Sequence, residues 1–195
     1  MSNLVLFAYN FPHKKTQDFL IYLVLLGFKP RAVLAADWVN LKYRQVALRT
    51  KPMHIALFHP KCISDHFGIP YYVVPHRSAA CLEILRKLRP DLGIIAGARI
   101  LPEPVISSFR LGILNFHPGL IPEARGLDAM LWSIYYDLPL GVTAHLIDKQ
   151  VDAGRIVRIK LIEERIDDTL VDLSIRLYET QLSMPVSYTH LRAHE

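Results

Sequence analysis

Apolar positions in this chain gather into short continuous runs, and these runs alternate with segments of helical spacing. The runs that predict buried strands are residues 3–9, 31–36, 54–58, 71–74, 91–96, 111–116, 141–148 and 155–162. Helices are indicated over residues 14–27, 78–88 and 126–136, and Thr169 and Asp172 have the spacing of a capping box that starts a last helix. This alternation predicts an α/β fold with a doubly wound, mostly parallel sheet and right-handed crossovers.

The C-terminal end of the chain breaks this pattern. Residues 185–195 (P-V-S-Y-T-H-L-R-A-H-E) have neither helical nor strand periodicity, and Pro185 is expected to end the helix that begins near Thr169. The segment resembles translated adapter sequence from a sequencing library, with an ordinary disordered C-terminus as the alternative. We therefore predict one domain over residues 1–184, truncated at its C-terminus, and a separate tail whose His190 and His194 have no function.

The composition is that of a soluble globular protein. With 51% hydrophobic and 21% charged residues, the chain is too apolar to be disordered. Its longest apolar run, Phe19–Phe28, is about half the roughly 20 residues that a membrane span needs, so it predicts a buried helix. Met1–Asn10 has no basic start and leads directly into a strand pattern, which is not typical of a signal peptide. These features predict a cytoplasmic protein that does not enter a membrane.

Charge indicates the kind of ligand rather than its identity. The net charge of +5 suits an anionic small molecule. The Lys and Arg residues are scattered and form no run, which disfavours nucleic acid as a partner and leaves tRNA as an alternative. No pattern in the chain indicates an oligomeric state.

Cysteine and histidine positions indicate no metal. Cys62 and Cys81 form neither a disulfide framework nor a paired metal motif, so both are predicted to be reduced thiols in the core. Four histidines have spacings that fit no zinc template, namely His54, His59, His66 and His76. The sequence therefore predicts no metal site.

The segment Asn115-Phe-His117-Pro-Gly-Leu-Ile-Pro122 has the strongest chemical signal. Asn115 and His117 are two residues apart at the C-terminal end of a predicted strand, so their side chains point the same way. Ligands bind at that end of the strands in open α/β sheets. The downstream loop Asp148–Gly154 can bring Asp152 to the imidazole. Such a set suits acyl transfer to an amine, because amide and imidazolium stabilise an oxyanion while the carboxylate orients and charges the imidazole.

Each of these residues also has a simpler interpretation. Asn115 alone is typical of a turn and His117 alone of a surface histidine, but their joint spacing with Asp152 favours a site. His145 lies on an alternating strand, either as a supporting residue of the site or as a half-buried structural histidine. An ion pair or packing within a helix is the structural alternative for three further residues, Arg99, Trp132 and Tyr135.

These motifs resemble those of the folate-dependent formyltransferases. This family includes glycinamide ribonucleotide, methionyl-tRNA and sugar-amine formyltransferases, and also the formyltetrahydrofolate deformylases. Its pattern N-x-H-P-x-x-L-P-x-x-x-G, then a G-x-T-x-H strand and a D-x-G loop, is matched in order by Asn115, His117, Pro118, Pro122 and Gly126, by Gly141, Thr143 and His145, and by Asp152 and Gly154. The segment Gly97–Pro102 is similar to the strand end at the family's pterin pocket. The resemblance covers most of residues 3–183 and implies the family's Rossmann-like catalytic fold.

The resemblance implies transfer of a formyl group from 10-formyltetrahydrofolate to a primary amine. Asn115 and His117 would polarise the formyl oxygen, and Asp152 would pair with His117 and help to relay the proton. Thr143 and His145 would support these residues. The folate pocket would be lined by Arg99, Leu101, Ile106, Ile147, Asp148 and Val151. The resemblance implies neither a metal nor a nicotinamide.

The loop after the first strand departs from the family pattern. Glycinamide ribonucleotide enzymes have a glycine-rich, phosphate-holding loop there, whereas Tyr9–Lys15 contains no glycine, so a phosphate could be held only by the charge of Lys14 and Lys15. This departure disfavours the purine-synthesis enzyme. Arg125–Asp128 with Trp132 is most similar to sugar-amine formyltransferases, so an amino sugar nucleotide is the expected acceptor, with methionyl-tRNA or glycinamide ribonucleotide as alternatives.

Two other classes of function stay open. A formyltetrahydrofolate hydrolase would need the same three residues, but that group typically has a fused N-terminal regulatory domain, and this chain starts at its first strand. A noncatalytic or nicotinamide-binding Rossmann-like protein is disfavoured because no G-x-G-x-x-G follows residues 3–9.

The turn after His117 is expected to contain a cis peptide bond. Members of the family often bend this loop at the Leu/Ile-Pro step, which is Ile121–Pro122 here. Only about 5–6% of X–Pro bonds in folded proteins are cis, so this expectation is a specific one. Pro118 follows His117 directly, which favours a trans bond there.

Overall fold

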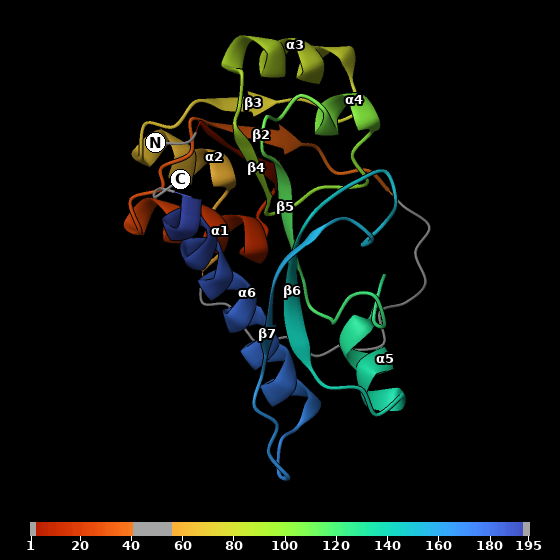
Figure 1. Ribbon diagram of the computed structural model, residues 1–195. Helices are drawn as coiled ribbons and strands as arrows, with labels where there is room; N and C mark the ends of the chain where they lie inside the picture. The colour runs from red at the N-terminus through yellow and green to blue at the C-terminus, as the bar shows by residue number, and fades with distance from the viewer. Residues whose placement is uncertain (1–2, 41–55, 193–195) are drawn as a thin grey trace.

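The computed structural model describes residues 3–40 and 56–192, with side chains described as far as Pro185. The strands are β1 (Leu4–Tyr9), β2 (Ala32–Ala36), β3 (Tyr71–Val73), β4 (Leu92–Ile95), β5 (Gly112–His117), β6 (Gly141–Leu146) and β7 (Ile156–Leu161). The helices are α1 (Lys14–Leu25), α2 (Pro60–His66), α3 (Ala79–Leu88), α4 (Glu103–Ile106), α5 (Ala129–Tyr135) and α6 (Leu170–Arg192). The strands form one sheet in the order β3-β2-β1-β4-β5-β6-β7 (Figure 1).

Strands β1 to β5 pair in parallel and lie between two layers of helices. The β1 residues Val5, Leu6 and Phe7 are completely buried, as expected for a strand covered on both faces. The apolar cluster on one face includes residues of α1, α2 and α6, and the cluster on the other includes residues of α3 and α4 (Figure 1). This arrangement confirms the doubly wound, mostly parallel α/β fold.

Strand β6 runs in the direction opposite to β1–β5, and the edge strand β7 returns to the direction of β1–β5. Both β5–β6 and β6–β7 are antiparallel pairs, and Asn115 lies opposite His145 while His117 lies opposite Thr143. Most residues of β7, the edge strand, are exposed. The C-terminal end of β5 therefore has a neighbour whose side chains meet its own across the ladder.

The last helix begins as predicted and ends later than expected. Asp172 Oδ2 accepts from the Thr169 N–H at 2.9 Å, and the Asp172 N–H donates to Thr169 Oγ1 at 3.3 Å, which confirms the capping interaction. Helix α6 continues through Pro185 to Arg192, so the expectation that Pro185 ends the helix is wrong. A proline removes a hydrogen bond from a helix, but packing in the core holds the turns before it, through Leu173, Leu177 and Met184. The domain boundary after residue 184 stays a prediction.

Some predicted boundaries differ from the structure. Residues 56–58 of the expected strand 54–58 are not in a strand, and residues 54 and 55 lie outside the described ranges. Instead, His59 caps the unpredicted helix α2 by accepting from the Lys61 N–H. Helix α5 begins at Ala129 rather than at residue 126, because Gly126 and Asp128 have φ of 84° and 56°.

The two cysteines have different surroundings. Cys81 is buried as predicted, and burial raises the pKa of its thiol to about 11. Cys62 is exposed on α2, so its prediction as a core thiol is wrong. The apolar run near the N-terminus forms α1, and no helix within residues 3–40 and 56–192 is long and apolar enough to span a membrane.

Candidate active site

Asn115 and His117 lie at the end of β5, on the same side of the strand. Phe116 between them points to the opposite face and packs against Phe19 of α1, with 5.6 Å between ring centroids. From β6, the His145 Nε2 lies 3.3 Å from the Asn115 Nδ2. The spacing of Asn115 and His117 on β5 predicted that their side chains share one side, and the pairing of β5 with β6 adds the second imidazole, that of His145.

Asp152 reaches this cluster from the loop between β6 and β7. Its Oδ2 lies 3.4 Å from His117 Nδ1, and its Oδ1 lies 3.5 Å from both His145 Nε2 and Asn115 Nδ2. The Gly126 N–H donates to Asp152 Oδ2 at 3.1 Å. The structure thus brings together all three residues that the sequence placed in the site.

The backbone around Asp152 is held close to β6. Asp152 itself is left-handed, with φ of 47°. Two residues further on, a Cβ at Gly154 would lie only 1.8 Å from the Leu146 carbonyl oxygen. Glycine at this position therefore permits the close approach that places the carboxylate.

The two ring nitrogens of His117 face different partners. Nε2 lies 2.6 Å from the Ala124 carbonyl oxygen, and because a carbonyl only accepts, Nε2 carries a proton and donates. Nδ1, which faces Asp152, is then protonated only in the imidazolium. Burial lowers the pKa of His117, while the Ala124 carbonyl and the charge of Asp152 oppose this shift. Asp152 therefore favours the charged form of a buried imidazole.

The carboxyl group of Asp152 is held in its ionised form. Burial alone would raise its pKa, but the hydrogen bond from His145, the charge of His117 and the Gly126 N–H together lower the pKa below its usual value. His145 is completely buried, and its Nδ1 has no hydrogen-bond partner among the described residues. Its contacts with Asp152 and Asn115 support the first of its two interpretations, a supporting residue of the site.

Thr143 supports the turn that follows His117. Its hydroxyl donates to the Gly119 carbonyl at 2.7 Å and accepts from the Ile121 N–H at 3.2 Å. The Ile121–Pro122 peptide bond in this turn is cis, as expected. Thr143 therefore contacts the backbone next to His117 rather than the ring.

Half of the residues expected in the folate pocket share one apolar cluster. Leu101 is buried there, and Ile106 and Ile147 pack against it. The Ile147 N–H also donates to the Ile113 carbonyl of β5 at 2.9 Å, which places this cluster beside the site strand. The other three expected residues lie nearer the surface: Arg99, which donates to the Val39 carbonyl, Asp148 and Val151.

Other residues that the sequence pointed to are spread over the fold. His59 caps α2, His66 packs edge-on against Phe67, and His76 lies 2.9 Å from the Leu34 carbonyl. No group of three or more metal-ligating side chains is present in the part of the chain that the structure describes. The Trp132 and Tyr135 rings of α5 contact each other edge to face, with 6.0 Å between their centroids, and both remain largely exposed.

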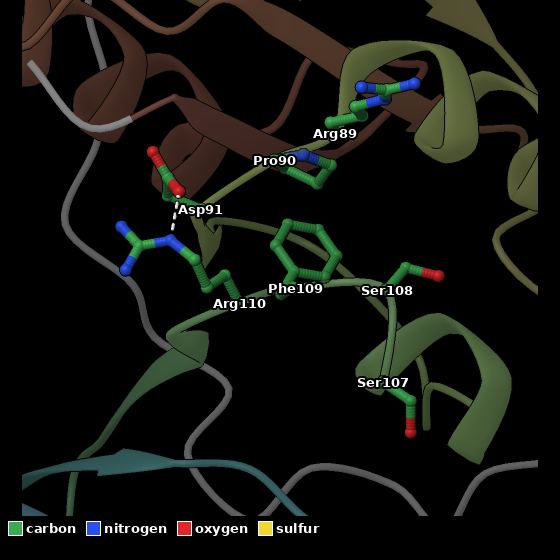
Figure 2. Close-up of a pocket in the computed structure, with 7 residues that line it drawn as sticks. All are labelled: Arg89, Pro90, Asp91, Ser107, Ser108, Phe109 and Arg110. Atoms are coloured by element: carbon green, nitrogen blue, oxygen red, sulfur yellow. Dashed lines mark hydrogen bonds and ion pairs between the residues drawn. The ribbon is translucent and has the colours of Figure 1, made fainter.

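One pocket lies at the amino edge of the sheet, opposite the edge that holds Asn115, His117 and Asp152. Figure 2 shows that it is lined by Arg89–Asp91, which lead into β4, and by Ser107–Arg110, which lead into β5. The Arg110 Nε donates to Asp91 Oδ1 at 2.6 Å across it. Because ligands of open α/β sheets bind at the carboxyl edge, this amino-edge pocket is not the candidate site.

The sequence interpretation missed several groups that contact the cluster. The Ala124 carbonyl and the Gly126 amide belong to the backbone, and no residue type identifies them in a sequence. The sequence indicates for Lys15 only a phosphate contact through its charge, whereas in the structure its ammonium donates to the Phe116 carbonyl of β5. Only the packing of α1 on the sheet could reveal that contact.

The fold and the cluster define an α/β protein with an amide, two imidazoles and a carboxylate at the carboxyl edge of its sheet. A model of the formyl transferase family matches residues 49–187, so the chain belongs to this family. A methionyl-tRNA formyltransferase of Parabacteroides distasonis is 31% identical over 147 residues, which are 68% of this chain and 45% of that protein. The chain thus spans less than half the length of this relative.

Solved structures share the fold. A phosphoribosylglycinamide formyltransferase from Anaplasma phagocytophilum has a TM-score of 0.74 at 22% identity, covering 100% of this chain and 88% of that one. A formyltetrahydrofolate deformylase from Pseudomonas syringae pv. tomato has a TM-score of 0.71 at 17% identity, covering 98% of this chain and 60% of that one. At these identities the likeness shows the fold alone.

Proposed function

We propose that this chain is a catalytic domain that transfers the formyl group of 10-formyltetrahydrofolate to a primary amine. The observation that supports this most directly is the contact of His117 Nδ1 with Asp152 Oδ2 beside the Asn115 amide. The pterin of the donor would contact the apolar cluster beside β5, with its other contacts from the 147–151 loop and Arg99. No metal takes part in this proposal.

In the proposed reaction, the amine nitrogen attacks the formyl carbon and the carbonyl oxygen becomes an oxyanion. The Asn115 amide N–H and the Nδ1–H of the His117 imidazolium donate to this oxygen, and Asp152 stabilises the imidazolium. When the intermediate collapses, the bond from the formyl carbon to the folate N10 breaks. The attacking amine loses one proton, N10 gains one, and Asp152 helps to relay it. The products are a formamide and tetrahydrofolate.

An amino sugar nucleotide is the proposed acceptor. The proposal rests on the Arg125–Asp128 segment and on Trp132, whose ring is exposed on the helix that follows the site loop. Methionyl-tRNA is the second candidate, favoured by the 31% identity to a methionyl-tRNA formyltransferase. The net charge of +5 is compatible with either anionic acceptor.

The test is an acceptor panel with the purified chain and 10-formyltetrahydrofolate. Amino sugar nucleotides, methionyl-tRNA, glycinamide ribonucleotide and buffer alone are compared, with formylated product and free formate measured by mass spectrometry. Formylation of an amine supports the transferase, and formate released without an amine would support the hydrolase instead. Asp152→Asn should abolish turnover, whereas the exposed Asp65→Asn should not. A chain that binds the folate and shows no turnover in any arm contradicts the proposal.

A further inference from the structure

Lys15 is a half-buried lysine that the proposed reaction does not use. It lies at the start of α1, and its ammonium donates to Gln181 Oε1 of α6 at 3.0 Å and to the Phe116 carbonyl of β5 at 3.4 Å. The ammonium also lies 5.5 Å from the centroid of the Phe19 ring. Gln181 is buried, and neither acceptor has a formal charge. Placing an ammonium against neutral acceptors costs free energy, because these hydrogen bonds only partly replace its hydration.

The acceptor on β5 is the peptide between the two site residues of that strand. Pairing of β5 with β4 ends at Leu114, two residues before Phe116. Because strand carbonyls alternate in direction, the Phe116 carbonyl points to the β4 side, like that of Leu114. The Ile113 carbonyl points the other way, where it accepts from the Ile147 N–H just after β6. The ammonium therefore binds the strand beyond the end of its parallel ladder, where Asn115 and His117 need a fixed backbone.

The charge of Lys15 also acts on the site. Burial lowers its pKa to about 8, and the charge of Asp152 opposes this shift. The charged and titratable groups that act on His117 are Asp152, which raises its pKa, and His145 and Lys15, which lower it. Lys14, the neighbour of Lys15, instead pairs with Asp18 at 2.7 Å and lies over the Tyr178 ring. Of these two adjacent lysines, only Lys15 bonds to β5.

We propose that Lys15 is a positioning residue of the site, whose ammonium, held by Gln181, fixes the Phe116 peptide between Asn115 and His117. Its expected effect on turnover rests on the proposed function. Its effect on the titration of His117 does not depend on that function. The inference about Lys15 and the proposed function can therefore fail separately.

The test compares Lys15→Met, Lys15→Arg and Lys14→Met in the whole chain. His117 is titrated by NMR of its ring nitrogens, with the signal assigned by its loss in His117→Gln. Removal of a nearby cation should raise the pKa of His117 in Lys15→Met, whereas Lys15→Arg should keep the wild-type pKa and Lys14→Met should not change it. Turnover by Lys15→Met should fall about tenfold in kcat with KM for the folate unchanged, the scale of a displaced catalytic group.

Methionine keeps the apolar stem but cannot donate to Gln181 Oε1 or to the Phe116 carbonyl, so the urea midpoint of Lys15→Met is measured beside its kinetics and turnover is expressed per folded molecule. If Lys15→Met does not fold, Gln181→Met gives the same test, because it removes the acceptor that holds the ammonium. The pKa of His117 should then rise by less than in Lys15→Met. A pKa of His117 that is the same in wild type, Lys15→Met and Gln181→Met would overturn the inference. A shifted His117 in a protein without formyl transfer would instead overturn the proposed function and leave the inference standing.

Discussion

His76 and His117 lie in opposite halves of the sheet and have similar surroundings. Both rings are buried, both have Nε2 near a backbone carbonyl, at 2.9 and 2.6 Å, and burial lowers both pKa values. They differ in the charge nearby, because Asp152 raises the pKa of His117 while Arg99 lowers that of His76 further. A carboxylate, rather than burial or a carbonyl acceptor, is what distinguishes the histidine of the site.

The direction of the strands explains where that carboxylate comes from. In the parallel half, β1 and β2 are covered on both faces, so their side chains are apolar and leave little room for polar partners. In the antiparallel half, the ladder sets His145 opposite Asn115, and the loop after β6 turns back with Asp152. The polar site therefore belongs to the half of the sheet where neighbouring strands reverse.

The largest expected effect comes from removing the two histidines in turn. His117→Ala should reduce formyl transfer about 100-fold or more, the scale for losing an oxyanion or acid–base group, with folate binding retained. His76→Ala should lower the urea midpoint through the lost packing and leave transfer per folded molecule unchanged. Steady-state kinetics and urea unfolding are measured on both variants. Equal losses of turnover in His117→Ala and His76→Ala would contradict the assignment of the site to one half of the sheet.

A glycine from each half gives the second comparison. Gly154→Ala places a methyl group against the Leu146 carbonyl, so the Asp152 loop must move, and we expect at least a tenfold loss of kcat. Gly27→Ala meets no atom within 4 Å but has φ of 81°, so it should cost roughly 1–2 kcal/mol of stability without affecting transfer. Turnover by Gly154→Ala at the wild-type rate would show that the loop does not position the carboxylate.

Two buried threonines sharpen the comparison at the level of single hydrogen bonds. Thr143→Val leaves the Gly119 carbonyl and the Ile121 N–H without this hydroxyl, and Thr16→Val does the same for the Ala96 carbonyl. Each should cost about 1–3 kcal/mol of stability. Only Thr143→Val should also lower kcat, by a few-fold, because its turn follows His117. A kinetic defect in Thr16→Val alone would contradict this assignment.

The smallest expected effect concerns the anchor of α6 at acidic pH. The Arg176 guanidinium, 2.7 Å away, lowers the pKa of Asp168 to about 2. Because the folded-state pKa lies below the unfolded one, this stabilisation is fully present above about pH 4 and is lost as pH falls through about 2. The urea midpoints of wild type and Asp168→Asn should therefore differ at neutral pH and converge in acid. A difference as large at pH 2 as at neutral pH would show that the pair does not stabilise through its charge.

The sequence by itself indicated the strands β1 to β5 and the geometry of Asn115 and His117, although it also predicted a strand over residues 54–58, of which residues 56–58 form none. Short continuous apolar runs are typical of strands covered on both faces, and a spacing of two residues on a strand places both side chains on one side. The capping residues of α6 could also be predicted from the sequence, because Thr169 and Asp172 are three residues apart and hydrogen-bond to each other. These features depend on local geometry, so the order of residues was sufficient.

Only the tertiary structure decided which distant groups complete the site. His145 meets Asn115 through an antiparallel register, and Lys15 reaches the Phe116 carbonyl only because α1 packs on the sheet. The same holds for Pro185, which local preference places at a helix end and which core packing of the preceding turns keeps inside α6. Contacts between residues far apart in the chain depend on the packing of whole elements, and that packing has no signature at any one position.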